Sequence, residues 1–319
     1  MTSTQKPYLS PDDRVKYLYE RNYFPAGSLT DSHIGRLGYL NFHYYLGYAR
    51  NYRVLVDSER IPGPKDPDDV FGIIDLDHEL SELLYSSLRK AEWNLRAAVV
   101  EKYSDKYDPY ETFLDHRSYE VVDSGHDPRG IVGDIVSSVL RYGEPYVASH
   151  LSQRSESSGL TNPPKRYDSV DHDSLVGLVR GLPLWSVIDS FSLGLLSRFI
   201  ERCDTGEIVK DRVWGQVAEH FEIPKKTFLT NLQALTVLRN LVSHHSRLWM
   251  RPMPISPYRS RMYKRQLRDV SQQAMMVNFY NLALFQSSRS ERDELINAVE
   301  AITARSSCYG YGIKKVSGA

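Results

Sequence analysis

The chain has 319 residues, which is enough for one large domain with a smaller attachment. Forty basic and forty acidic residues cancel to a formal net charge of zero, so overall charge indicates no nucleic-acid partner and any basic surface has to be local. The two cysteines, Cys203 and Cys308, match no metal-ligand or redox spacing and favour a reducing compartment. No apolar run could span a bilayer and residues 1–10 lack a signal-peptide pattern, so the sequence predicts a cytoplasmic protein without a membrane partner.

The first part of the chain predicts a small helical unit followed by a linker. Ser10 before Pro11 and two acids is typical of a helix start, and a second, aromatic-rich helix is expected from about Thr30 to Val56. The proline- and acid-rich residues 57–72 predict a linker.

The rest of the chain, residues 73–319, has helical periodicity. The strongest pattern runs from Ile73 to about Tyr103, where leucines recur at spacings of three and four and Glu92 lies four residues before Arg96, a spacing that favours an ion pair. The residues from 152 to 173 predict a long loop, and the tail from residue 310 is expected to be frayed. Further helices are expected at about 127–142, 182–202, 214–221, 224–249, 268–287 and 290–304. No stretch shows sustained alternation, so the prediction is an all-α helical bundle with an N-terminal two-helix extension.

The stretch from Leu238 to Trp249 carries the candidate catalytic residues. His244 can transfer protons near neutral pH, and Arg239 can hold a phosphate with its planar fork of donors. Asn240 lies four residues before His244 and shares its helix face.

Helix geometry leaves the cooperation of Arg239 and His244 open. Five residues apart, they diverge by roughly 140° on an unbroken helix. The helix could end near Ser243, the arginine could curl round, or two copies of the chain could face each other across a two-fold axis. A purely structural explanation is that Arg239 is an ion-paired arginine at the core edge and His244 a helix-end residue, while His245 is expected to be structural.

A basic strip follows directly and contains no acid between residues 247 and 268. Its cations can bind phosphates, and interleaved aromatic residues can stack on unpaired bases. The alternative is a solvated run of charge. The candidate RNA-binding residues are Arg247, Arg251, Arg259, Arg261, Lys264, Arg265 and Arg268.

Metal and cofactor sites have little support in the sequence. His116, His126 with Asp127, and the run 171–173 have no recognisable ligand spacing, so neither a metal site nor a cofactor is expected. A phosphate-binding glycine loop and a nucleophile elbow are also lacking, which argues against a nucleotide-driven motor or a serine hydrolase.

The chain resembles the Abi-like abortive-infection proteins (the AbiD and AbiF group), a branch of the HEPN superfamily. The stretches that carry the resemblance are Leu18–Tyr23 with Leu37–Tyr48, Leu182–Trp185 with Phe191–Gly194, and Leu238–Trp249. The HEPN pattern of arginine, polar residue, short spacer and histidine falls on Arg239, Asn240 and His244.

This resemblance implies a HEPN-like helical bundle, often dimeric, with metal-independent endoribonuclease activity in many members. It also implies a role in antiphage defence or as a toxin, sometimes with a small regulatory RNA as partner. The expectation is therefore an RNA-binding protein that cleaves RNA by attack of a ribose 2′-hydroxyl. The alternatives are a non-catalytic RNA-binding or interaction module and a DNA-binding regulator.

Overall fold

The computed structural model of the chain describes residues 8–121, 129–157, 172–208 and 211–316. Across those ranges the secondary structure consists of fourteen α-helices and short 3₁₀ turns, without a strand. The predicted all-α helical bundle is therefore confirmed.

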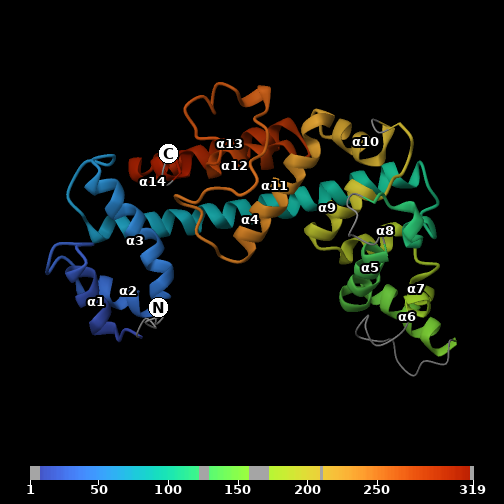
Figure 1. Cartoon of the computed structure of the whole chain (residues 1–319), viewed down its shortest axis with the longest axis horizontal. Coiled ribbons are helices and arrows are strands. Elements are labelled where there is room, and N and C mark those ends of the chain that lie inside the picture. The colour runs from blue at the N-terminus through green and yellow to red at the C-terminus, as the bar shows by residue number, and fades with distance from the viewer. Residues whose placement is uncertain (1–7, 122–128, 158–171, 209–210, 317–319) are drawn as a thin grey trace, which may run out of the picture.

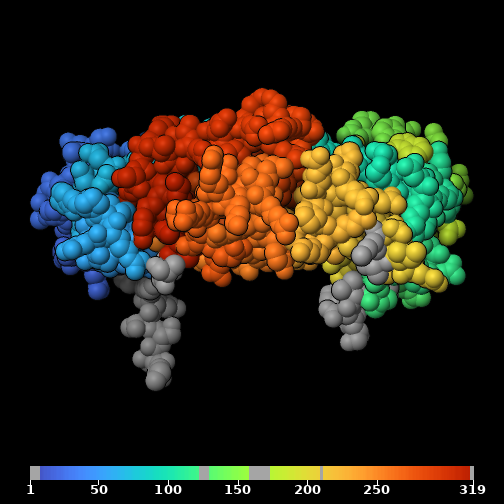
Figure 2. Space-filling view, turned by 90° about the horizontal axis from the view of Figure 1, so that it is seen from above, coloured from blue at the N-terminus to red at the C-terminus, as the bar shows by residue number. Residues whose placement is uncertain are grey.

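One long helix, α4 (Pro67–Ser104), is the axis of the molecule. Figure 1 shows the N-terminal helices at one end of α4, a second group of helices at the other end, and the C-terminal half of the chain along its middle. The view from above shows the same elongated arrangement (Figure 2). The helix begins at Pro67 and not at Ile73, because the Asp66 side chain accepts a hydrogen bond from the Asp68 backbone N–H and caps it. The predicted linker 57–72 is correspondingly shorter.

The N-terminal unit has three helices, so the predicted two-helix extension is wrong. They are α1 (Pro11–Glu20), α2 (Asp31–Tyr39) and α3 (Phe42–Asp57). Ser10 caps α1 as expected. The predicted second helix is divided because Leu40 is extended and the Asn41 side chain accepts hydrogen bonds from the backbone of His43 and Tyr44, which starts a new helix.

The opposite end is formed by four helices that the sequence only partly predicts. They are α5 (Arg129–Tyr142), α6 (Pro145–Ser157), α7 (His172–Val179) and α8 (Leu184–Val187). The loop expected at residues 152–173 is wrong at its start, because helix α6 continues to Ser157. The remainder of that loop up to residue 171, and the expected helix start at Asp127, lie outside the described residues.

The helix expected from 182 to 202 is two helices in the structure. Helix α9 (Leu193–Arg202) follows α8 after a break at Phe191, because the Ser192 side chain accepts a hydrogen bond from the Leu195 backbone and caps a new start. Helix α10 (Val213–His220) confirms the short helix expected at 214–221.

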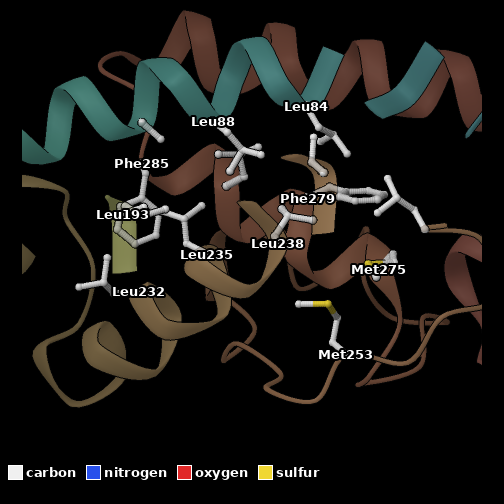
Figure 3. Packing of buried hydrophobic residues seen from close by; sticks show 14 of the residues in the cluster. Leu84, Leu88, Leu193, Leu232, Leu235, Leu238, Met253, Met275, Phe279 and Phe285 are labelled. Carbon is white, nitrogen blue, oxygen red and sulfur yellow. The ribbon is translucent and has the colours of Figure 1, made fainter. Parts of the chain in front are cut away.

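The core lies between α4 and the C-terminal half of the chain. Helices α11 (Lys225–Ser243), α12 (Met275–Leu284) and α13 (Arg289–Ala304) all contact α4. Figure 3 shows Leu84 and Leu88 of α4 pointing towards Leu235 and Leu238 of α11 and towards Phe285. These side chains are all buried, which explains the leucine periodicity of both helices.

The C-terminal tail is folded, so the expectation of fraying from residue 310 is wrong up to residue 316. Helix α14 (Ser307–Lys314) packs on the fully buried ring of Trp249, whose Nε1–H donates to the Cys308 carbonyl oxygen over 3.2 Å. A Cβ at Gly312 would lie 2.0 Å from Trp249 Nε1, so only glycine allows this approach.

None of the described helices is both long and apolar enough to cross a bilayer.

Candidate functional site

Helix α11 ends one residue before His244, as one of the three geometric alternatives expected. The backbone N–H of His245 donates to the Val242 carbonyl, and that of Ser246 donates to the Leu241 carbonyl, which is the Schellman arrangement. His245 supplies the left-handed residue of this motif, with φ 51°. His244 is the C-cap residue, and its backbone N–H still donates to the Asn240 carbonyl as in the helix, so the chain leaves the spiral only after His244. The helix end therefore does not by itself turn the His244 side chain towards Arg239.

Arg239 is held at the edge of the core by an acid of α4. Its Nε–H donates to Glu92 Oε1 over 3.0 Å, and the other Glu92 oxygen lies 3.5 Å from Arg96, which confirms the ion pair expected between those two residues. The Arg239 side chain is 30% exposed against 13% for Glu92. Arg239 Nη1 also donates to Asn240 Oδ1 over 3.4 Å. Arg239 thus makes the ion pair that a purely structural role would require, while part of its side chain remains exposed to solvent.

Asn240 and His244 are both exposed to solvent. An exposed imidazole at a helix end can reach a bound phosphodiester without any rearrangement of the core. Arg239 and Asn240 are in contact, and His244 follows one helical turn later, so the three predicted residues occupy one short segment.

The segment after His244 is fastened by a buried carboxylate that the sequence did not single out. Asp77 of α4 accepts hydrogen bonds from the backbone N–H groups of Leu248 (2.9 Å) and Trp249 (3.2 Å). It also accepts from the hydroxyls of Tyr48 (2.6 Å) and Tyr309 (2.9 Å). Asp77 is almost fully buried, and this burial raises its pKa, while the four donors oppose that shift.

A signal for Asp77 was present in the sequence. It falls on the apolar side of α4, between Ile73 and Leu80, where an unpaired acid would be costly. A charged residue in such a stripe indicates that other parts of the chain supply donors to it.

The basic strip divides into two kinds of residue. Arg247 donates to the Gly47 carbonyl oxygen and its guanidinium lies 5.7 Å from the Tyr48 ring centroid, and burial lowers its pKa. Arg259 donates to Gln272 and to the carbonyls of Leu267 and Val270. These two arginines hold the loop together. Arg251 is half-buried, and the exposed members are Arg261, Lys264, Arg265 and Arg268.

Figure 2 shows where the strip lies on the molecule. The orange segment that includes it covers the middle of the surface, between the N-terminal helices and the yellow region of α10. Its exposed cations are therefore available to a partner that approaches the C-terminal half of the chain.

The other histidines form no recognisable centre in the described residues. His116 lies in the 3₁₀ turn His116–Ser118, whereas His126, Asp127 and Asp171 fall outside the description, as does the side chain of His172. Within the ranges searched, no group of three His, Cys, Asp or Glu side chains is placed to hold a metal ion.

A family model described as Abi-like protein matches residues 32–250, which is more than half of the chain. The matched part runs from α2 through the whole of α11 to Met250, and it leaves most of the basic strip and helices α12–α14 outside. No curated protein and no solved structure matches the chain. The chain therefore belongs to the Abi-like family, which places it among proteins of abortive infection and defence.

Proposed function

We propose that this protein is a HEPN-type RNA-binding protein that cleaves RNA without a metal ion, as an antiphage effector or toxin. The observation that carries the proposal is the placement of His244. It is exposed at the end of α11, directly after the Arg239–Asn240 pair and directly before the basic strip.

In the proposed reaction the 2′-oxygen of a ribose forms a bond to the adjacent phosphorus, and the bond from phosphorus to the 5′-oxygen breaks. The 2′-hydroxyl gives its proton to the neutral imidazole of His244, and an imidazolium returns a proton to the leaving 5′-oxygen. The products are a cyclic phosphate and a 5′-hydroxyl, with no net uptake of protons. Arg239 stabilises the extra negative charge on the phosphate oxygens, and Asn240 orients the phosphate or the imidazole.

The test compares wild type with His244→Ala on total RNA in the presence of a chelator, with the new ends mapped. We expect wild type to leave cyclic phosphates and 5′-hydroxyls, and His244→Ala to leave the RNA intact at the same melting temperature. Cleavage that disappears with chelator and returns with magnesium or manganese would contradict the role of His244.

A non-catalytic RNA-binding or interaction module is the second candidate, and the Arg239–Glu92 ion pair favours it, because that contact alone accounts for the arginine. Arg239→Lys separates the two functions. Lysine keeps the charge beside Glu92 but lacks the planar fork, so a catalytic arginine predicts lost cleavage at nearly unchanged stability. Unchanged cleavage or binding would favour the structural role.

A further inference from the structure

Two large aromatic rings and a cation lie on one exposed face of α4. Tyr85, Arg89 and Trp93 follow one another at spacings of four, so they share a face of the helix. Trp93 is 56% exposed and Tyr85 is 50% exposed. Single exposed aromatic residues are common on protein surfaces, but two beside an arginine on one face form a continuous surface.

This face lies beside the His244 segment. The Arg239–Glu92 contact fastens one end of the segment to α4, and the hydrogen bonds from Leu248 and Trp249 to Asp77 fasten the other. Residues 240–247 therefore follow α4 between Glu92 and Asp77, and Tyr85 lies in the middle of that stretch. Figure 1 shows α11 crossing α4 in the central part of the molecule.

The same face is directly connected to Arg239. Glu92, which holds Arg239, precedes Trp93 and lies seven residues after Tyr85, a spacing of two helical turns on one side. The aromatic face is thus the surface that a strand bound at Arg239 meets next.

The chemistry of the face suits unpaired bases. The Arg89 guanidinium lies 5.2 Å from the centroid of the Trp93 ring, and among the described residues Arg89 takes part in no ion pair. Aromatic side chains stack on any exposed base, and arginine adds a cation–π contribution and attraction for phosphate. The bases of a duplex are already stacked and paired, so a platform of this kind selects single strands.

We infer that Tyr85 and Trp93 form a stacking platform for unpaired RNA bases, so that the substrate class of the site is single-stranded RNA. The inference rests on the proposed function and specifies its substrate. RNA is favoured over a second copy of the chain as the occupant, because Arg89 takes part in no ion pair among the described residues and because exposed cations follow the His244 segment in the chain.

The test measures affinity for a single-stranded RNA and for a duplex of the same sequence, in the His244→Ala background so that the RNA stays intact. Trp93→Ala and Tyr85→Ala are each expected to weaken single-strand binding by about 5- to 150-fold, the range for loss of one stacked base. Trp93→Phe keeps a ring and should recover most of the affinity. The salt slope should stay the same, because stacking releases no counterions.

Trp185→Ala is the matched control. Trp185 is 48% exposed on α8 at the far end of the molecule, so its removal should leave RNA affinity unchanged. Melting curves of all variants exclude loss of folding as the cause of a weaker affinity.

The outcomes separate this inference from the proposed function. If the His244→Ala protein binds no RNA and wild type cleaves none, both fall. If RNA is bound and cleaved while Trp93→Ala and Tyr85→Ala behave like Trp185→Ala, only the platform is refuted. If the two variants change the mass of the protein in solution without changing RNA affinity, the face is an interface between copies, and the inference is likewise overturned.

Discussion

The single side chain of Asp77 joins four separate parts of the chain. Its two oxygens accept from backbone groups of Leu248 and Trp249 and from hydroxyls of Tyr48 and Tyr309. A buried carboxylate with this many donors is tolerated because each lone pair is used, and removal of one partner leaves the others unsatisfied. The position of the segment after His244 therefore depends on Asp77.

Asp77→Asn is expected to lower the free energy of unfolding by about 1–3 kcal/mol, since an amide group would face N–H and O–H donors. The pKa of Asp77 is raised by burial, so the folded value lies above the unfolded one. The contribution of its protonation to stability is then complete below the ordinary pKa of about 3.9 and is lost as pH rises through the folded pKa. The advantage of wild type over Asp77→Asn should shrink across that window.

Denaturant unfolding of both proteins at a series of pH values measures this difference. An advantage of wild type that grows with pH would contradict the prediction and would show that the four hydrogen bonds outweigh burial.

Within the basic strip, a shared position in one loop does not decide whether a cation is hydrogen-bonded to the protein or exposed to solvent. Arg259 is occupied by Gln272 and two carbonyl groups, and Arg247 by Gly47, whereas the cations from residue 261 onward are exposed. Only the exposed group is suited to a partner.

Replacing the exposed cations Arg261, Lys264, Arg265 and Arg268 together with alanine is expected to weaken RNA binding across sequences. The salt slope should fall by about 0.7 for each phosphate contact that is lost from a single strand. Binding measured over a range of salt concentrations gives the slope. The control is Arg141→Ala with Arg154→Ala, two exposed arginines at the far end of the molecule. An equal slope in wild type and the fourfold variant would show that the strip is only a solvated surface.

Gly312→Ala is expected to destabilise the protein by about 1–3 kcal/mol, because the new methyl group would overlap the Trp249 ring. Thermal unfolding measures the loss, and cleavage should decline with it. Gly35→Ala is the matched control in helix α2, where a Cβ meets nothing within 4 Å, so stability should hold or rise. An undisturbed Gly312→Ala protein would contradict the tight packing of α14.

The sequence predicted those elements whose stabilising contacts repeat at a regular local spacing. Helices α4 and α11 were found because leucines such as Leu84 and Leu238 recur on one face. Helix α14 was missed because its stability comes from long-range contacts, such as those with Trp249 and Asp77, which no local pattern records. The candidate site residues are neighbours in the sequence itself, but the pairing of Arg239 with Glu92 joins distant helices and could not follow from spacing. Their catalytic role stays a prediction.

On the scale of the whole molecule, α4 connects two helical groups that lie far apart, and the site lies between them (Figure 1). The N-terminal unit is tied to the bundle by Tyr48, which donates to Asp77 and stacks on Trp249 with a centroid distance of 6.3 Å. The unit therefore contributes directly to the surroundings of the site.

We predict a homodimer with Asn240 and His244 of each copy facing one shared groove. Mixing His244→Ala chains with wild type should then lower activity per wild-type chain, because mixed pairs lack one imidazole. Light scattering measures the mass of the assembly in the same samples. A protein that is monomeric and fully active at micromolar concentration would contradict the dimer, and the helix end at Ser243 would then suffice for a complete site in one chain.

The contacts of α14 also determine when, during synthesis of the chain, the surroundings of the site can be completed. Tyr309 and Gly312 are translated after the His244 segment, yet they secure Asp77 and Trp249 beside it. At ordinary rates of synthesis, roughly 3–13 seconds pass between translation of Trp249 and of Gly312. During that interval the nascent chain carries the three site residues without the helix that fastens them, so the proposed cleavage would be withheld until α14 has been made.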